Sequence, residues 1–129
     1  MPPINVFHPQ RGVFDPEAGI PIAALTSCDA LTFYLSDIPP QGTVHAHAHS
    51  QGDEVYLILS GQGCLYRQAP GEERQSVSVA AGDLLRVPAE QVHQLVNLGE
   101  QPLRLLFVCR ASHLSDDRVL HQDLREVAP

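Results

Sequence analysis

Three histidines stand at alternate positions in one short segment of the chain: His45, His47 and His49. Side chains alternate between the two faces of a strand, so an extended segment points all three imidazoles to the same side. Burying three polar imidazole rings in an apolar core is unfavourable, whereas neutral imidazole is a common ligand of divalent metals. The turn at residues 50–53 then brings Glu54 to the start of the next strand, where its carboxylate can join two imidazoles. The segment therefore predicts a metal site.

A further histidine lies in another part of the chain. A predicted strand ends at Pro88, a short turn follows, and His93 lies on the strand after that turn. A lone histidine carries little information by itself. A hairpin of this kind can nevertheless bring His93 to a site that is built from other strands of a barrel.

Together the two segments resemble the two motifs of the cupin superfamily. The first motif, within residues 42–61, contains two histidines one residue apart, then a glutamate after four residues and a glycine after six: His47, His49, Glu54 and Gly61. The second, within residues 82–97, reads Gly82, Pro88, His93 and Asn97 at the family spacing. Two positions depart from the pattern. Four residues rather than five separate Gly42 from His47, and Glu90 replaces the second glycine of the second motif.

The resemblance implies a ligand set of His47, His49, Glu54 and His93. Three neutral nitrogen donors and one carboxylate suit one divalent transition metal, and Fe, Mn, Ni, Zn, Co and Cu all remain open. A degenerate cupin with packed, metal-free histidines is the alternative. The histidines outside the two motifs are expected at the surface: His8, His113 and His121.

His45 has three possible roles. It can stand behind the ligands or at the mouth of the pocket, it can be exposed to solvent, or it can replace His49 in a shifted register. The shifted register uses His45 and His47 and leaves six residues before Glu54, which falls outside the family spacing. We therefore rank that register last.

Two further residues are pocket candidates. Tyr56 shares a strand face with Glu54, so it can line the pocket near the metal or pack as a core residue. Arg86, like Arg104, sits on a strand that is otherwise apolar. Either guanidinium could bind an anionic substrate inside the barrel, but we expect both to face outward because a buried charge needs a partner. The predicted strands also carry Cys64 and Cys109, which are expected as buried thiols.

Short strands must position these residues. Eleven Pro and nine Gly interrupt the chain at short intervals, and the segments between them are rich in Val, Leu, Ile and Tyr. This pattern is typical of an all-β antiparallel barrel, and the cupin resemblance specifies a small jelly roll. The predicted strands are residues 31–38, 54–59, 64–68, 76–79, 84–87, 91–96 and 103–110.

The two ends of the chain differ from this core. The first 20 residues hold four prolines and predict an extended N-terminal arm, which in small β-domains often adds a strand to a neighbouring subunit. Near the other end, Leu120, Leu124 and Val127 recur at helical spacing, which predicts a short C-terminal helix over 115–127 or an arm on the barrel. We expect one cupin domain over residues 1–129, with the barrel core at about 22–110.

Composition excludes several classes of function. The formal net charge of −7 repels phosphate backbones and anionic lipid, so neither nucleic acid nor membrane is an expected partner. No apolar run approaches the roughly 18 residues that span a bilayer. The N-terminus lacks the features of a signal peptide, and three dispersed cysteines do not make a disulfide framework, so we expect a cytoplasmic protein. Cupins commonly dimerise, and the resemblance implies a homodimer.

The resemblance defines a site more closely than a reaction. We expect a metalloenzyme that acts on a small organic molecule inside the barrel, either as an oxygenase or dioxygenase or in redox-neutral isomerase, lyase or cyclase chemistry. Thiol dioxygenases of the family usually lack the glutamate ligand, so Glu54 argues against that branch. The alternative is a non-catalytic module that binds or senses a small molecule. The intact ligand set favours the enzyme, because members that only bind often lose one or more ligands.

Overall fold

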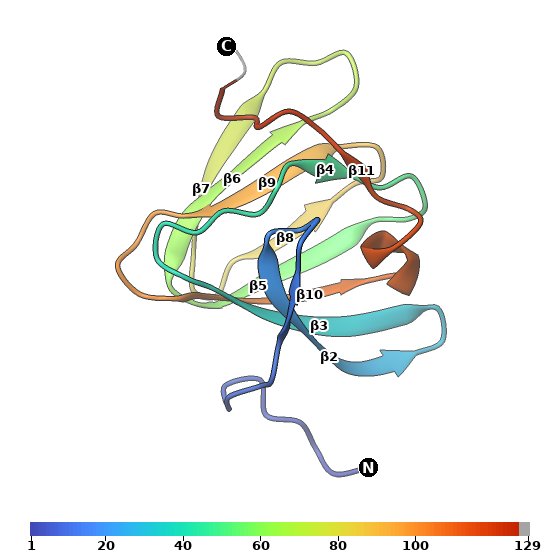
Figure 1. Ribbon diagram of the computed structural model, residues 1–129, viewed down its shortest axis with the longest axis vertical. Helices are drawn as coiled ribbons and strands as arrows, with labels where there is room; N and C mark the ends of the chain where they lie inside the picture. The colour runs from blue at the N-terminus through green and yellow to red at the C-terminus, as the bar shows by residue number, and fades with distance from the viewer. Residues whose placement is uncertain (127–129) are drawn as a thin grey trace.

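Two antiparallel sheets face each other in the computed structural model, which describes residues 1–126 (Figure 1). The first sheet has the strand order β1 (Val13–Asp15), β2 (Ile20–Cys28), β3 (Leu31–Ile38), β10 (Leu103–Cys109), β5 (Glu54–Ser60) and β8 (Leu84–Val87). The second has the order β11 (Val119–Leu120), β4 (His47–Ala48), β9 (Val92–Asn97), β6 (Gln62–Gln68) and β7 (Gln75–Ala80). The all-β prediction is therefore confirmed. One short 3-10 helix, η1 (Ala111–Leu114), follows β10.

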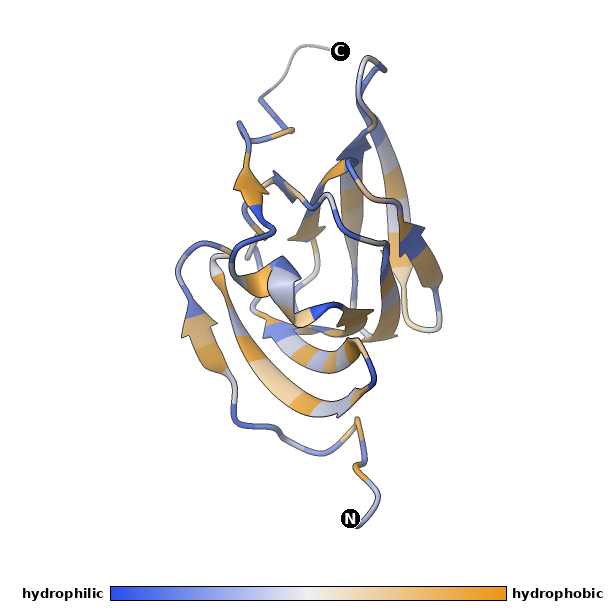
Figure 2. Cartoon of the chain, turned by 90° about the vertical axis from the view of Figure 1, so that its right-hand side faces the viewer, coloured by the Kyte–Doolittle hydropathy of each residue, from blue (hydrophilic) through white to orange (hydrophobic). Residues whose placement is uncertain are grey.

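The core lies between the two sheets because each central strand turns alternate residues inward. In β10 the buried side chains are Leu103, Leu105, Phe107 and Cys109. They meet Leu65 of β6 and other apolar residues of the second sheet in one cluster. Figure 2 shows the resulting alternation of hydrophobic and hydrophilic residues along the strands. A period of two in the sequence thus produces one apolar interior.

Two motif residues fix the turns at one end of the sheets. The side chain of Asn97 is completely buried, and its Nδ2 donates hydrogen bonds to the carbonyls of Ile38 (3.0 Å), Pro39 (3.1 Å) and Gln101 (2.8 Å). Gly61 has a φ of 89°, and a Cβ there would lie 2.7 Å from the carbonyl oxygen of Pro102. Only glycine fits such a position without strain.

The seven strands predicted from the sequence all form, and their ends agree with the prediction to within two residues. The sequence did not indicate β1, β2 or β11, and the extended segment expected at residues 45–49 forms a strand only at His47–Ala48, which is β4. The N-terminal arm is extended as expected, but β1 pairs with β2 of its own chain.

The predicted C-terminal helix is wrong for residues 115–126, and Val127 lies outside the described residues. The alternative of an arm is correct, because β11 pairs with β4 and lies beside it in Figure 1. Leu120 is exposed while Leu124 is buried, so the helical spacing does not mark one apolar face. Side chains replace helical hydrogen bonds here: Gln94 accepts from the Leu124 amide (2.8 Å), and Arg74 donates to its carbonyl (2.8 Å). Among residues 1–126, no helix is long and apolar enough to cross a membrane.

Candidate metal centre

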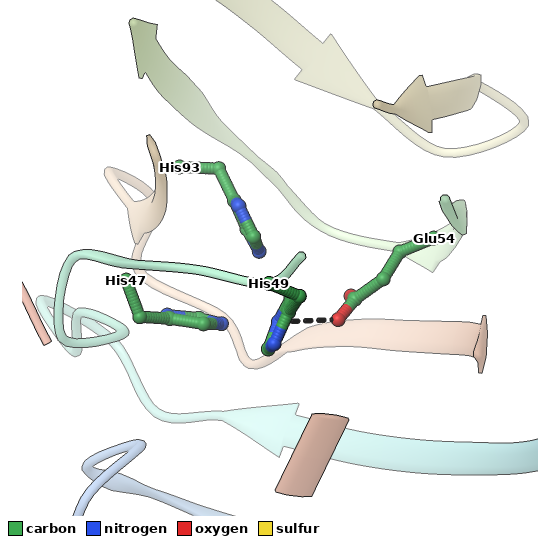
Figure 3. A group of neighbouring side chains, drawn as sticks. All are labelled: His47, His49, Glu54 and His93. Atoms are coloured by element: carbon green, nitrogen blue, oxygen red, sulfur yellow. Dashed lines mark ion pairs between the residues drawn. The ribbon is translucent and has the colours of Figure 1, made fainter. Parts of the chain in front are cut away.

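Three strands bring four potential ligands to one point between the sheets. His47 lies in β4, His49 follows that strand, Glu54 begins β5 and His93 lies in β9, where it pairs with His47 across the strands. One ligand atom from each side chain lies within 4.8 Å of the others, and all four residues are buried. Figure 3 shows the four side chains converging. The structure thus brings together the predicted ligand set.

Each of the three imidazoles is oriented by a backbone carbonyl. The Nδ1 atom bonds to the carbonyl of His45 in His47 (2.7 Å), of Asp117 in His49 (2.7 Å) and of Gln91 in His93 (3.0 Å). A carbonyl only accepts, so Nδ1 must carry the hydrogen and Nε2 of the neutral ring keeps its lone pair. This arrangement is typical of metal-binding histidines, whose second nitrogen fixes tautomer and ring orientation.

The free lone pairs face the carboxylate and one another. Nε2 of His49 and Nε2 of His93 are buried and make no hydrogen bond within the described part of the chain. The His49 Nε2 atom nevertheless lies 2.6 Å from Oε1 of Glu54. Two acceptors at this distance repel each other unless a cation neutralises them. The donor set therefore fits a divalent metal ion.

Burial keeps these groups in the protonation states that a metal requires. Desolvation lowers the pKa of His93. Desolvation, together with the electrostatic interaction with His93, lowers the pKa of His47 well below its usual value. For Glu54 burial raises the pKa, but the hydrogen bond from His113 and the surrounding imidazoles outweigh it, so the pKa falls. Neutral imidazole and ionised carboxylate are the forms that bind metal.

His113 is a site residue that the sequence analysis missed. It was expected at the surface, but it is completely buried. Its Nδ1 lies 3.0 Å from Oε1 of Glu54, and its Nε2 lies 2.6 Å from the carbonyl oxygen of Gln51. Both partners are acceptors, so both ring nitrogens donate. Burial by itself lowers the pKa of His113, but these hydrogen bonds raise it above its usual value. The ring also stacks on His49, with centroids 4.1 Å apart.

Of the pocket candidates, only Tyr56 lines the cavity beside the ligands. This cavity measures about 30 Å³ and is lined mainly by apolar side chains, together with the candidate ligands His47, His49 and Glu54 and with Arg118. His45 is exposed, and its Nδ1 bonds to the carbonyl of Glu17 (3.0 Å). Arg86 is exposed on the outer surface, 3.4 Å from Asp53. Neither His45 nor Arg86 therefore belongs to the cavity.

Arg104 also lies away from the cavity, in a bidentate pair with Asp37 (2.7 and 2.8 Å).

Cys64 and Cys109 are buried thiols, as predicted. Cys109 lies near Glu54 and His113, and burial raises the pKa of its thiol far above neutrality. His49 also lines an open groove of about 480 Å³, whose lining includes Glu72, Glu90 and His121.

Known proteins share this sequence pattern. A family model described as "Cupin domain" matches residues 34–109. Glucose-6-phosphate isomerase from Pyrococcus furiosus is 33% identical over 64 residues, which cover 50% of this chain and 34% of that protein. An uncharacterized protein from Methanocaldococcus jannaschii is 28% identical over 69 residues, which cover 54% of this chain and 51% of that protein. The match thus spans a third to a half of the length of these relatives.

Solved structures share the fold. A predicted oxalate decarboxylase from Thermotoga maritima superposes with a TM-score of 0.61 at 28% identity, over 69% of this chain and 77% of that one. A protein from Klebsiella pneumoniae with a double-stranded β-helix domain gives a TM-score of 0.65 at 19% identity, over 78% and 83% of the two chains. The two facing sheets therefore form the jelly roll expected from the sequence. With a family model that matches more than half of its residues, this chain belongs to the cupin domain family.

Proposed function

We propose that this chain is a metal-dependent enzyme that performs redox-neutral chemistry, of the isomerase or lyase class, on a small oxygen-bearing molecule. His47, His49, Glu54 and His93 hold the divalent metal. The observation that carries the proposal is the convergence of imidazole lone pairs on a buried carboxylate, with each Nδ1 already bonded to a carbonyl. Relatives named as a glucose-6-phosphate isomerase and a predicted oxalate decarboxylase favour the redox-neutral branch over an oxygenase.

The residues around the ligands have separate tasks. A bound divalent metal supplies a Lewis acid that polarises a substrate oxygen. Burial raises the pKa of Tyr56 well above its usual value, so its hydroxyl stays protonated and can donate a hydrogen bond to a substrate in the cavity. The apolar walls exclude water from the reacting atoms. His113 keeps Glu54 ionised and oriented.

The cavity favours a very small ligand. Its volume of about 30 Å³ is far below the roughly 300–1,000 Å³ of ordinary ligand pockets. Arg118 is the guanidinium in its wall, and this group is already paired with Asp15 (2.8 Å). A module that binds a small molecule without turning it over is the second candidate function, because so closed a cavity restricts the movement of substrate and product.

We also infer that the enzyme works as a homodimer. The outer face of the six-stranded sheet carries apolar side chains on neighbouring strands, among them Leu106 in β10, Leu57 in β5 and Leu84 in β8. Val55 and Leu84 are exposed there. The chain's own N-terminal segment lies against part of this face, where Arg104 donates to the carbonyls of Val6 and His8, and a second copy of the chain would cover the part around Val55 and Leu84.

Metal content tests the proposal first. We expect about one equivalent of metal in untagged protein and in the control variant His8→Ala, whose imidazole is exposed in the N-terminal arm. His93→Ala is expected to lose the metal while its circular dichroism spectrum stays that of a folded β-protein. A wild-type protein without metal even after reconstitution, or a fully loaded His93→Ala variant, would contradict the metal centre.

The reaction class needs a second experiment. The metal-loaded protein is incubated with small hydroxy-carbonyl and dicarboxylic compounds in D₂O and followed by NMR, with an oxygen electrode in parallel. Conversion or deuterium exchange without oxygen uptake supports redox-neutral chemistry. Oxygen uptake that depends on substrate would assign the protein to the oxygenase branch. Ligand binding without either change would assign it to the binding module.

A further inference from the structure

The loop between two candidate ligands is held by one carboxylate. Residues 50–53 join His49 to Glu54. Oδ1 of Asp117 accepts hydrogen bonds from the amide and from the hydroxyl of Ser50, each at 2.8 Å. Oδ2 accepts from the amide of Gln51, also at 2.8 Å. These three hydrogen bonds fix the start of the loop, which sets the distance between the two ligands.

The same residue also orients one ligand directly. The backbone carbonyl of Asp117 accepts the Nδ1–H of His49 at 2.7 Å. Four residues earlier, His113 contacts Glu54 and also bonds to Gln51 inside the loop. The segment 113–117 therefore touches both ligands and the loop that joins them.

A buried ion pair holds this segment in place. The Arg118 side chain is only 3% exposed, and it donates to both carboxylate oxygens of Asp15 at 3.1 and 2.8 Å. Its Nε donates to the carbonyl of His113 at 3.2 Å. Asp15 lies in β1, so the N-terminal edge strand of the sheet supports the segment 113–117, which contacts both ligands.

We propose that Asp117 is a positioning residue of the metal centre, which holds the 50–51 backbone and the His49 ring so that His49 and Glu54 face the same ion. The inference depends on the proposed metal centre. It concerns a residue outside residues 34–109, the part that the family model matches. Partners behind metal ligands typically change metal affinity by about 10- to 100-fold.

Cobalt titration tests the inference without any activity assay. The dissociation constant for Co²⁺ is measured by calorimetry and by visible absorption in wild type, Asp117→Ala, Asp117→Asn and the control Asp116→Ala. Asp116 is the exposed neighbour, so its replacement removes the same charge and leaves the loop alone. We expect about 10- to 100-fold weaker binding in Asp117→Ala and none of this loss in Asp116→Ala.

The asparagine variant separates hydrogen bonding from charge. Asp117→Asn removes the same charge but keeps an oxygen that can accept from Ser50, so its affinity should lie between those of wild type and Asp117→Ala. It also serves as the test variant if Asp117→Ala does not fold. If Asp117→Asn and Asp116→Ala lose the same amount of Co²⁺ affinity, the effect is due to charge and the inference is overturned.

Two other results would also overturn it. If the Asp117 variants are less stable in urea yet bind Co²⁺ as tightly as wild type, Asp117 serves the fold alone. If wild type binds neither Co²⁺ nor Mn²⁺, the proposed metal centre itself fails. Because the second result appears in the unmutated protein, the two failures are distinguishable.

Discussion

Individual side chains at the candidate centre respond to burial in opposite ways. His47 and His93 are surrounded by protein without a carboxylate hydrogen bond, so desolvation lowers their pKa values. His113 is also buried, but its pKa rises because hydrogen-bond acceptors face both of its ring nitrogens. Its other polar or charged neighbours are Asp117 at 3.7 Å, the stacked ring of His49, the Cys109 thiol and Arg118, which donates to the His113 carbonyl. The same buried cluster therefore contains two kinds of group. His47 and His93 destabilise the fold as the pH falls, whereas His113 loses its stabilising contribution as the pH rises.

The stability of metal-free protein should consequently peak near pH 6.5, the ordinary pKa of histidine. Below that pH, His47 and His93 bind protons in the unfolded chain but stay neutral in the folded protein. The free energy of unfolding therefore falls by up to about 1.4 kcal/mol per pH unit for each residue. The His113 contribution is complete below pH 6.5 and is lost as the pH rises through its raised folded pKa. Urea unfolding from pH 5 to 8 measures both sides.

The variant His113→Gln provides the control for this profile. It should abolish the decline on the alkaline side and keep the acid decline. A stability that rises steadily to pH 8 in the wild type would contradict the assignment of His113.

The elements explain why the ligands were predictable and the residues behind them were not. Strand alternation and one turn group the histidines of residues 45–49 with Glu54, and the resemblance to the cupin motifs selects His47 and His49 among them. His45 fits the same alternation, but β4 contains only residues 47–48, and His45 bonds to Glu17 instead. His113 lies in η1, a 3-10 turn of four residues with no periodic signal. Its contact with Glu54 joins residues 59 positions apart, which only the folded chain reveals.

The turns offer a test that separates the fold from the centre. Asn97→Ala leaves the carbonyls of Ile38, Pro39 and Gln101 without the buried donor that satisfies them. An unsatisfied buried polar group costs about 1–3 kcal/mol, and partial exposure of this loop should limit the total to about 3 kcal/mol. Metal affinity should remain within about threefold of wild type, because Asn97 contacts none of the four candidate ligands.

Chemical denaturation and Co²⁺ titration measure these two quantities. Asn5→Ala is the matched control, since the side chain of this exposed asparagine accepts from the nearby Phe7 amide and its replacement should change stability by less than about 0.5 kcal/mol. An Asn97→Ala protein with wild-type stability would mean that the amide is not needed to join these turns.

At the scale of the whole molecule, the six-stranded sheet carries apolar side chains on both faces, although Arg86 and Arg104 also lie on the outer one. Tyr56 and Phe107 point into the core, while Val55 and Val108 lie opposite each other on the outer face. An antiparallel sheet with one solvated face normally alternates apolar and polar residues. The sequence runs of β5 and β10 lack that alternation, which is why they predict strands clearly but do not say what covers their outer side.

Assembly is therefore the property that this outer face should control. We expect wild type to be a dimer by size-exclusion chromatography with light scattering, because a stable interface needs about 800 Å² per partner and this sheet offers a broad apolar area. Leu84→Lys places a charge on the exposed outer face and should weaken the dimer at least tenfold. Leu98→Lys is the control, since Leu98 is similarly exposed but lies in the loop before β10. A monomeric wild type at micromolar concentration would contradict the dimer, and equal dimer affinity in both variants would place the interface elsewhere.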